Sequence, residues 1–396
     1  MMHVAATGDS TGCIQVLAAK GEPVSPRDLD GLEPLHCAAM TGTPASVAWL
    51  LEHGADIEAT TLESWGNKTP LMAASSTGNT GCGAFLIRRG AKVLKLDTRG
   101  HTVMGLVIEG KHISFVKMLI QEHPGQFETW MTDVSRGSPI HWAALAGSVD
   151  ILRVLLDAAP PSWRIEALSN QDTTPLYEAV SKNKQDCAEL LLKHGASVLT
   201  KCRGRTVIHR AARHDQVDLL RVMVQALPRN HTVDILADDG DTPLRHAAAW
   251  GKPESVRFLI EQGASALKKN DKVLTPIHAA AEQGCTECLQ LLISALPAHE
   301  SGLDIPGGEL SATPLMYAAM AGKVDCAELL LANGASGQTR DAKDWTAAHH
   351  AAFSGSVGEM RLSSTRRGPH MTPRTRLQSQ APTFPLSRHF STRDSL

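Results

Sequence analysis

The sequence has little of what several protein classes need. Aromatic residues make up 4% of the 396 residues and cysteines number eight, too few for a disulfide-stapled scaffold. No apolar run approaches the roughly 18–20 residues of a membrane-spanning helix, and the opening MMHVAATGDS lacks the basic and apolar regions of a secretory signal. Lysine and arginine (39) nearly balance aspartate and glutamate (41), which disfavours a generally basic nucleic-acid binder. We therefore expect a cytoplasmic protein, with the nucleus as the alternative.

What the sequence does have is apolar content, at 42%, and an internal repeat. The string Thr-Pro-Leu/Ile-x recurs ten times, complete or degenerate. The second residues of the strings are Pro34, Pro70, Val103, Pro139, Pro175, Val207, Pro243, Pro276, Pro314 and Ala347. In nine copies the distance from this residue to the end of the next apolar pair is always 17 residues, as from Pro243 to Ile260. The distance from that apolar pair to the next string varies from 15 to 21 residues. A constant segment has to be packed, and a variable one is a loop that tolerates insertions.

The constant segment predicts two short helices. Threonine followed by proline starts the first, because the hydroxyl caps the helix and proline's missing N–H has no helical partner there. An alanine pair follows, as at Ala247-Ala248, and then a glycine that ends the helix, as at Gly251. The second helix carries apolar residues at helical spacing and stops at a Gly-Ala pair, as at 263–264.

The pattern Asp-Gly-x-Thr-Pro-Leu-x-x-Ala-Ala-x-x-Gly…Leu-Leu-x-x-Gly-Ala resembles the ankyrin repeat family, with close matches at 239–244 and 330–335. Nine full copies, called repeats 1 to 9 below, cover residues 28–340. An incomplete copy occupies 1–27 and a truncated tenth occupies 341–357. The resemblance implies an all-α solenoid of stacked helix–turn–helix units with β-hairpin loops, whose concave face binds other proteins. Neighbouring units bury the apolar faces that one unit cannot bury alone.

The repeat pattern stops inside the tenth copy. Residues 358–396 hold seven arginines, no lysine and two acids, a net charge of +5, and their composition predicts disorder. One hypothesis is a functional basic arm phosphorylated at sites such as Ser379 and Ser391. The other, which we favour, is an alternative exon or a shifted reading frame that interrupts a longer array. Because neither end has a complete capping repeat, we expect both ends to fray.

The sequence holds no catalytic, cofactor-binding or metal-binding motif that we recognise, phosphate loops and HExxH included. Cys285 and Cys288 form a Cys-x-x-Cys, half of a structural zinc site. Cys288 also shares a repeat column with Cys82, Cys187 and Cys326, which predicts buried packing thiols. Histidine recurs at the fourth position of the string, where the resemblance implies a local hydrogen bond that supports the hairpin. These histidines are His36, His141, His209, His278 and His349. We therefore expect no enzyme activity, no cofactor and no metal.

Repeat 6 and its neighbours carry the strongest candidates for partner binding. Arg205 falls on the expected hairpin, and Arg213, His214 and Trp250 fall just before the turn after a first helix, which the resemblance places in the groove. Trp142 in repeat 4 adds an aromatic candidate. Arginine and tryptophan are enriched at binding hot spots, so these residues predict a partner segment with acidic side chains. The alternative is a solvated basic surface, on which Trp250 only covers the adjacent repeat.

The sequence thus predicts a monomeric, non-catalytic scaffold or adaptor that binds partner proteins through the concave face of an ankyrin array. The alternative is the regulatory ankyrin portion of a larger enzyme, channel or acyltransferase whose effector domain this chain lacks. A third hypothesis has the basic tail bind nucleic acid or an anionic membrane. It is opposed by the net charge of −7 on residues 1–357.

Overall fold

The computed structural model describes residues 1–8, 11–122, 137–158, 165–297 and 302–355. These residues form 21 α-helices and two short 3-10 helices, η1 (Glu63–Trp65) and η3 (Gly302–Asp304), and contain no β-strand. The prediction of an all-α repeat is confirmed. Two isolated bridges, Cys202 with Arg205 and Gly307 with Ala312, are the sheet-like pairings within this part of the chain, so the loops are hairpin-like turns. The predicted tail at 358–396 lies outside the described residues.

Every string begins a helix at its second residue. These first helices are α3 (Pro34–Thr41), α5 (Pro70–Thr77), α7 (Val103–Glu109), α9 (Pro139–Ala146), α11 (Pro175–Ser181), α13 (Val207–Arg213), α15 (Pro243–Ala249), α17 (Pro276–Gln283), α19 (Pro314–Met320) and α21 (Ala347–Phe353). The cap is local: the hydroxyl of Thr242 accepts a hydrogen bond of 3.2 Å from the N–H of Arg245, and Pro243 occupies the first helical position.

In repeats 1 to 9 a second helix begins ten residues after the first, as from Pro243 to Pro253. These second helices are α4 (Pro44–Glu52), α6 (Thr80–Arg88), α8 (Ile113–Glu122), α10 (Val149–Ala158), α12 (Gln185–Lys193), α14 (Val217–Gln225), α16 (Pro253–Glu261), α18 (Thr286–Ser294) and α20 (Val324–Ala332). Ahead of repeat 1, the short α1 (Met2–Ala6) and α2 (Thr11–Ala19) pack against α3 and α4.

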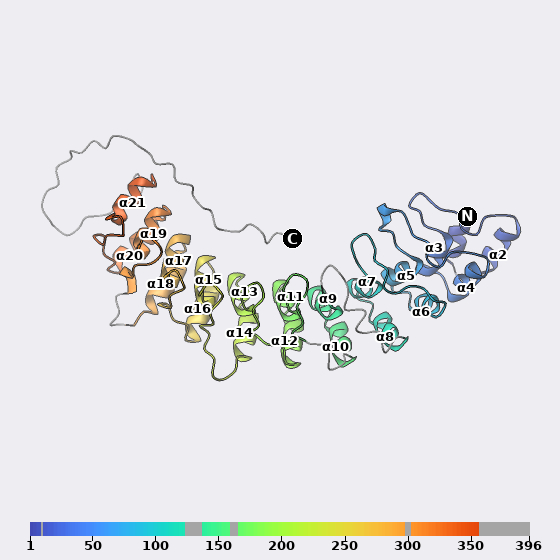
Figure 1. Cartoon of the computed structure of the whole chain (residues 1–396), viewed down its shortest axis with the longest axis horizontal. Coiled ribbons are helices and arrows are strands. Elements are labelled where there is room, and N and C mark those ends of the chain that lie inside the picture. Colours follow the sequence, from blue (N-terminus) through green and yellow to red (C-terminus); the bar gives the residue numbers. More distant parts are fainter. Residues whose placement is uncertain (9–10, 123–136, 159–164, 298–301, 356–396) are drawn as a thin grey trace. The chain divides into compact units, whose positions relative to one another are not determined.

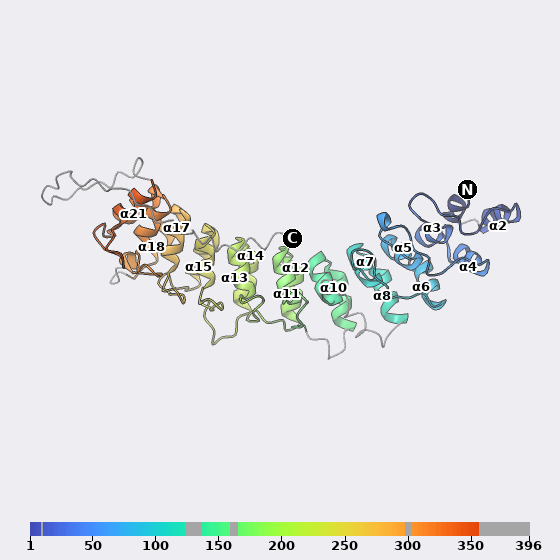
Figure 2. The ribbon, with the colours of Figure 1, turned by 45° about the horizontal axis from the view of Figure 1, so that its top comes forward.

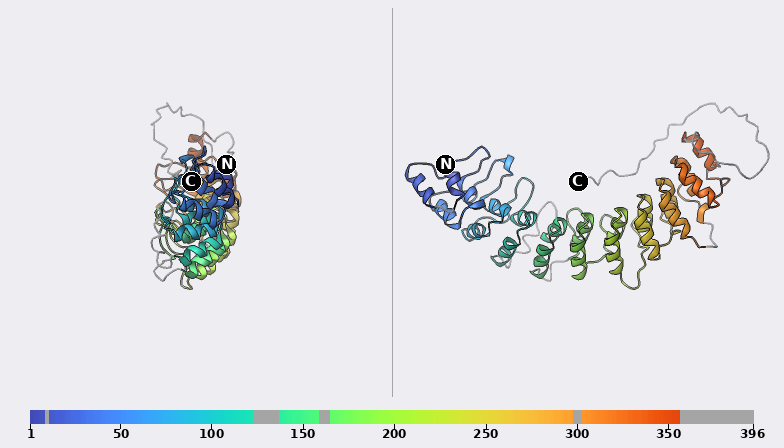
Figure 3. Two further views of the ribbon diagram at one scale, coloured as in Figure 1. Left: turned by 90° about the vertical axis from the view of Figure 1, so that its right-hand side faces the viewer. Right: turned by 180° about the vertical axis from the view of Figure 1, so that it is seen from behind.

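The helix pairs stack in chain order and form two layers. First helices contact first helices of the adjacent repeats, and second helices contact second helices (Figure 1). Figure 2 shows the same order in a tilted view, and Figure 3 shows the pairs from behind. The interior is aliphatic: Leu244, Ala247 and Ala248 of α15 and Val256 and Leu259 of α16 are fully buried. Alanine allows the first helices to approach one another closely, and leucine and valine fill the space between the layers.

The loops between repeats are tied to one another by backbone hydrogen bonds. In the loop before α15, the N–H of Ala237 donates to the carbonyl of Asp241 across the turn (2.9 Å). The N–H of Asp238 donates to the carbonyl of Gly204 in the preceding loop (2.9 Å). Gly240 sits at the turn with φ +73°, and a Cβ there would lie 2.4 Å from Asp271 of the next loop, which explains the glycine.

Carboxylates add a second tie that the sequence did not reveal. An acid in the loop of one repeat accepts the N–H of the residue that follows the Gly-Ala pair of the next repeat. The pairs are Glu58 with Lys92 (2.7 Å), Glu166 with Ser197 (2.7 Å), Asp234 with Ser265 (3.2 Å) and Asp304 with Ser336 (2.9 Å). In the sequence, the acidic residue stands 31 to 34 positions before the residue that follows the Gly-Ala pair. This spacing can be recognised only once the register of the loops is known.

Candidate functional site

The structure brings Arg213, His214 and Trp250 together. Arg213 ends α13 and His214 follows it, while Trp250 follows α15 in the next repeat. The guanidinium carbon of Arg213 lies 3.9 Å from the centre of the Trp250 ring, and Trp250 and His214 are exposed. A guanidinium that close to an indole gains a cation–π attraction. The two positions before the turn therefore form one surface that spans two repeats.

Arg210 extends this surface toward repeat 5. It precedes Arg213 by three residues on α13, and its guanidinium carbon lies 5.7 Å from the centre of the Tyr177 ring on α11. We call Tyr177, Arg210, Arg213, His214 and Trp250 the arginine–aromatic surface. The sequence did not single out Tyr177. It is the third residue of its helix, a position that buried residues such as His209 occupy in other repeats.

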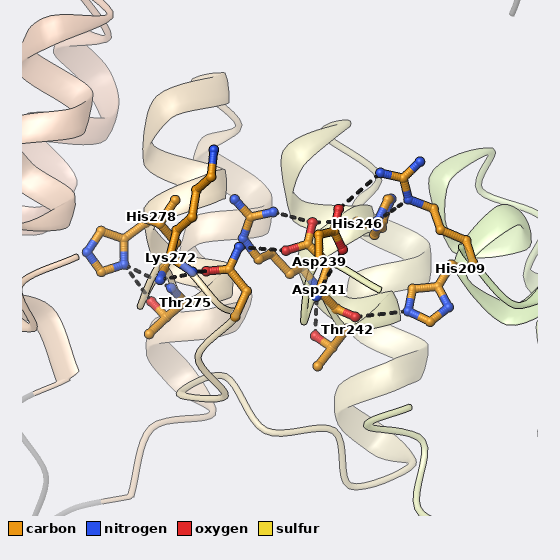
Figure 4. Close-up of polar contacts among 12 residues, drawn as sticks. His209, Asp239, Asp241, Thr242, His246, Lys272, Thr275 and His278 are labelled. Atoms are coloured by element: carbon orange, nitrogen blue, oxygen red, sulfur yellow. Dashed lines mark hydrogen bonds and ion pairs between the residues drawn. The ribbon is translucent and has the colours of Figure 1, made fainter. Parts of the chain in front are cut away.

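Arg205 has a different environment, because its guanidinium ties repeat 6 to repeat 7. Its Nε donates to Nε2 of His246 (3.2 Å) and its terminal nitrogen donates to Oδ2 of Asp239 (3.1 Å), as Figure 4 shows around the labelled acceptors. An open pocket of about 340 Å³ lies beside it, lined by Arg203, Gly204, Arg205, Asp238 and Asp239. Charges of both signs line this pocket. The hydrogen bonds of Arg205 connect the loop of repeat 6 to repeat 7.

The same link continues toward repeat 8. Asp241 accepts a hydrogen bond from the guanidinium of Arg245 at 2.5 Å and one from the amide of Asn270 at 2.7 Å. Burial raises the pKa of Asp241, and Arg245 and Asn270 oppose that shift. Burial, together with the charges of His209, Arg205 and Arg245, holds the pKa of His246 well below its usual value. Because Arg205 donates to Nε2 of His246, that ring is neutral, and its approach of 3.6 Å to Asp241 is no ion pair.

Asp239, Asp241 and His246 are also the residues that come nearest to a metal site in the described part of the chain. One ligand atom from each lies within 4.8 Å of the others. However, Arg205 already pairs with Asp239 and donates a hydrogen bond to the ring nitrogen of His246. Arg245 already pairs with Asp241. A metal would have to displace two cations, so this donor set fits an internal charge network better than a metal centre.

Trp142, the aromatic candidate of repeat 4, is largely buried. Its side chain is 5% exposed and its ring lies edge-on to His101, with the ring centres 5.0 Å apart. His101 comes from the loop before α7, so Trp142 packs back against repeat 3. Trp250 is instead the residue that directly follows α15, and it is 39% exposed.

The string histidines support the helix starts, and His36, His141, His209 and His278 also reach the loop that follows their own helices. In His209, Nδ1 faces the hydroxyl of Thr206 at 2.8 Å and the Thr206 N–H, while Nε2 donates to the carbonyl of Asp241 in the next loop at 3.0 Å (Figure 4). His278 makes the same set with Thr275 and the carbonyl of Ala312. Burial lowers the pKa of His209 and of His278 to about 4.

The cysteines are free thiols, and the four in the shared column are buried, as the sequence predicts. Burial raises the pKa of Cys82, Cys187 and Cys326 to about 11, which keeps them protonated and unreactive at neutral pH. The Cys-x-x-Cys is a helix cap, because the sulfur of Cys285 accepts the N–H of Cys288 at 3.2 Å at the start of α18. Within the described residues, no helix has the length and apolar character needed to cross a membrane.

Comparison with known proteins gives several longer relatives. The chain is 25% identical over 369 residues to transient receptor potential cation channel subfamily A member 1 of Homo sapiens, covering 91% of this chain and 32% of that protein. It is 28% identical over 200 residues to ankyrin repeat protein nuc-2 of Neurospora crassa, covering 41% and 18%. It is 26% identical over 248 residues to ankyrin repeat and SOCS box protein 16 of Homo sapiens, covering 56% and 53%. The chain thus spans about half or less of the length of each of these relatives.

The repeat itself is recognised along most of the sequence. The family model that describes three copies of the ankyrin repeat matches residues 1–61, 107–202, 140–229, 198–270 and 277–361, which is more than half of the chain. The strings, the constant helix spacing and the stacked helix pairs occur in the same segments. The chain therefore belongs to the ankyrin repeat family.

Proposed function

We propose that the protein is a non-catalytic scaffold or adaptor that binds partner proteins through the face formed by its first helices. Membership of a family of interaction modules supports a binding role. The observation that carries the location is the exposed Trp250 with Arg213 stacked on it, because large aromatic and arginine side chains dominate binding energy at interfaces. Eight free thiols fit a protein that works in a reducing compartment.

The test is partner capture in cells with the full chain. Proximity labelling compares the wild-type protein with Arg213→Glu combined with Trp250→Ala, and with Arg221→Glu as the matched control. Arg221 lies over the Phe258 ring at 5.5 Å, a similar pair on the second-helix layer. We expect the double variant to lose partners that the wild type and the control retain. Equal partner sets for all three proteins would place the binding surface elsewhere, and no enriched partner for the wild type would contradict a binding role.

A second candidate function follows from the relatives. The chain matches parts of a cation channel and of a protein named as an E3 ubiquitin-protein ligase in Arabidopsis thaliana, covering 32% and 19% of their lengths. We propose as the alternative that this array is the regulatory portion of a longer enzyme, channel or acyltransferase. Long-read sequencing of transcripts tests it: an array followed in frame by a catalytic or membrane domain supports this role, and transcripts that encode the array alone contradict it.

A further inference from the structure

We propose that Cys285 and Cys288 form a reversible modification site for hydroperoxides, at which hydrogen peroxide closes a disulfide between the two thiols. Cys285 supplies the sulfur that attacks the peroxide, and Cys288 supplies the thiol that completes the disulfide. The pair lies at the start of α18 in repeat 8, and neither thiol belongs to the arginine–aromatic surface. The site is therefore independent of the proposed partner binding.

The first turn of α18 brings the two side chains together. Cys285 is the N-cap, and its sulfur accepts the N–H of Cys288 at 3.2 Å. At the same two positions of α4, the hydroxyl oxygens of Thr43 and Ser46 lie 3.3 Å apart. Residues three apart in a helix have Cα atoms about 5 Å apart, which lies within the range that a disulfide spans. Two sulfurs at these positions can therefore bond with little movement of the backbone.

The two thiols differ in their access to solvent, and this difference assigns their roles. Cys288 is fully buried, and burial together with a hydrogen bond to the Cys285 side chain raises its pKa. Cys285 is half-buried, and a Cβ on Gly251 of the preceding repeat would lie 3.9 Å from its sulfur. Because residue 251 is a glycine, it presents no side chain to that sulfur. A small oxidant can therefore reach Cys285 first.

The start of α18 suits a sulfur that attacks as a thiolate. The free N–H groups of a first helical turn favour the thiolate, which is the nucleophilic form of cysteine. From the next repeat, the stem of Lys323 passes close to the residue before Cys285, since a Cβ on Gly284 would lie 2.6 Å from its Cδ. Glu287 in the same turn carries the opposite charge and pairs with Arg257 at 3.2 Å.

The reaction balances with hydrogen peroxide as the oxidant. The thiolate sulfur of Cys285 bonds to one peroxide oxygen, the O–O bond breaks and the other oxygen leaves as hydroxide, which takes up the proton that Cys285 gave up and becomes water. Cys285 is then a sulfenic acid. The sulfur of Cys288 bonds to the sulfur of Cys285, the S–O bond breaks, and the thiol proton leaves with the oxygen as water. The two thiols lose two electrons and the peroxide gains them, and thiol–disulfide exchange reverses the modification.

The test treats the full, reduced chain with hydrogen peroxide and follows its tryptic peptides by mass spectrometry. Residues 273–323 form one tryptic peptide whose only cysteines are Cys285 and Cys288. We expect this peptide to lose the mass of two hydrogens and both of its alkylatable thiols, and dithiothreitol to restore them. Cys285 should react at least about tenfold faster than Cys37, a half-buried thiol whose pKa is raised to about 11 by burial.

Three variants separate the roles of the two sulfurs. Cys285→Ser keeps a side chain that caps helices well. Ser46 and Ser255 occupy the position of Cys288 in α4 and α16, so Cys288→Ser should also fold. We expect Cys288 to stay reduced in Cys285→Ser, and Cys285 to stop in Cys288→Ser at a sulfenic acid that dimedone traps. Cys326→Ser, at the same position of α20, is the matched control and should form the disulfide as the wild type does.

No mass loss in the 273–323 peptide would overturn the proposal, and so would equal rates for Cys285 and Cys37. A disulfide that joins this peptide to residues 324–340 would make Cys326 the second thiol and contradict the pair. Oxidation of Cys288 in the Cys285→Ser variant would show that peroxide reaches the buried thiol directly, which contradicts the assigned roles.

Discussion

A buried histidine of the repeat string cannot take up a second proton without losing a hydrogen bond, because both of its ring nitrogens are engaged. Nδ1 of His209 is held by the Thr206 cap and Nε2 donates to the next loop, so protonation of Nδ1 would break the cap that starts α13. His278 stands in the same position at the start of α17. These side chains therefore couple the charge state of the protein to the stacking of its loops.

The protein should lose stability as the pH falls from about 6.5 to about 4. His209 and His278 have folded-state pKa values of about 4, below the ordinary 6.5, so in this window the unfolded chain binds protons that the folded chain does not. Their contribution is complete above pH 6.5, and each pH unit below costs up to about 1.4 kcal/mol for each histidine. Urea unfolding across this range measures the slope.

The variant His209→Gln with His278→Gln is the control for that titration. Glutamine at this helix position completes a capping box without a titratable ring. We expect a flatter pH dependence between 6.5 and 4 than in the wild type. An unchanged slope would show that other groups, such as carboxylates, account for the loss of stability.

Two glycines of α6 should respond in opposite ways to the same substitution. A Cβ on Gly83 would lie 2.3 Å from the ring of buried Phe115, whereas one on Gly81 would lie 3.5 Å from Pro44, an ordinary contact. Gly83→Ala should lower the free energy of unfolding by about 1–3 kcal/mol. Gly81→Ala should leave it unchanged or raise it by up to about 1 kcal/mol, because alanine favours helix. Equal effects on chemical denaturation would mean that α6 and α8 do not pack as described.

At the scale of elements, the loops are held by contacts between repeats. The carboxylate of Asp234 accepts the N–H of Ser265 in the next repeat, while Asp238 in the same loop forms an exposed pair with Lys201. A backbone N–H deprived of its acceptor costs more than a surface ion pair contributes. The two aspartates are therefore a matched pair for measuring how loops contribute to stacking.

Asp234→Ala should lower the free energy of unfolding by about 1–2 kcal/mol. Asp238→Ala should change it by less than about 0.5 kcal/mol, since its partner is exposed. Both are measured by urea denaturation at neutral pH. Similar losses for the two variants would contradict the role of the acid-to-backbone tie.

The helices could be predicted from the sequence because their signals are local. Thr242 and Pro243 lie next to each other in the chain and specify where α15 starts, and the same holds at the other strings. The directions of long side chains could not be predicted in this way. Arg205 reaches His246 of repeat 7 and Trp142 packs against His101 of repeat 3, and the repeat pattern reveals neither contact. Those outcomes depend on side chains 41 residues away in both cases.

At the scale of the whole array, each repeat contacts its immediate neighbours, so stability adds up along the stack. Hydrogen exchange should be slowest in the central repeats and fast in α1 and α21, which have a neighbouring first helix on one side within the described residues. Mass spectrometry on the full chain measures this profile. Amides of α21 as protected as those of α11 in repeat 5 would contradict the predicted fraying.

The proposed binding surface belongs to this scale too, because its arginines, Arg210 and Arg213, lie in repeat 6 and their rings lie in the two neighbouring repeats. A double-mutant cycle on partner capture by proximity labelling tests this most directly, with Arg213→Gln, Trp250→Ala and both together. If Trp250 acts by positioning Arg213, its removal should weaken binding several-fold in the wild type and have little further effect once Arg213 is replaced. Independent, multiplicative losses, or no loss in either single variant, would contradict a surface built across repeats.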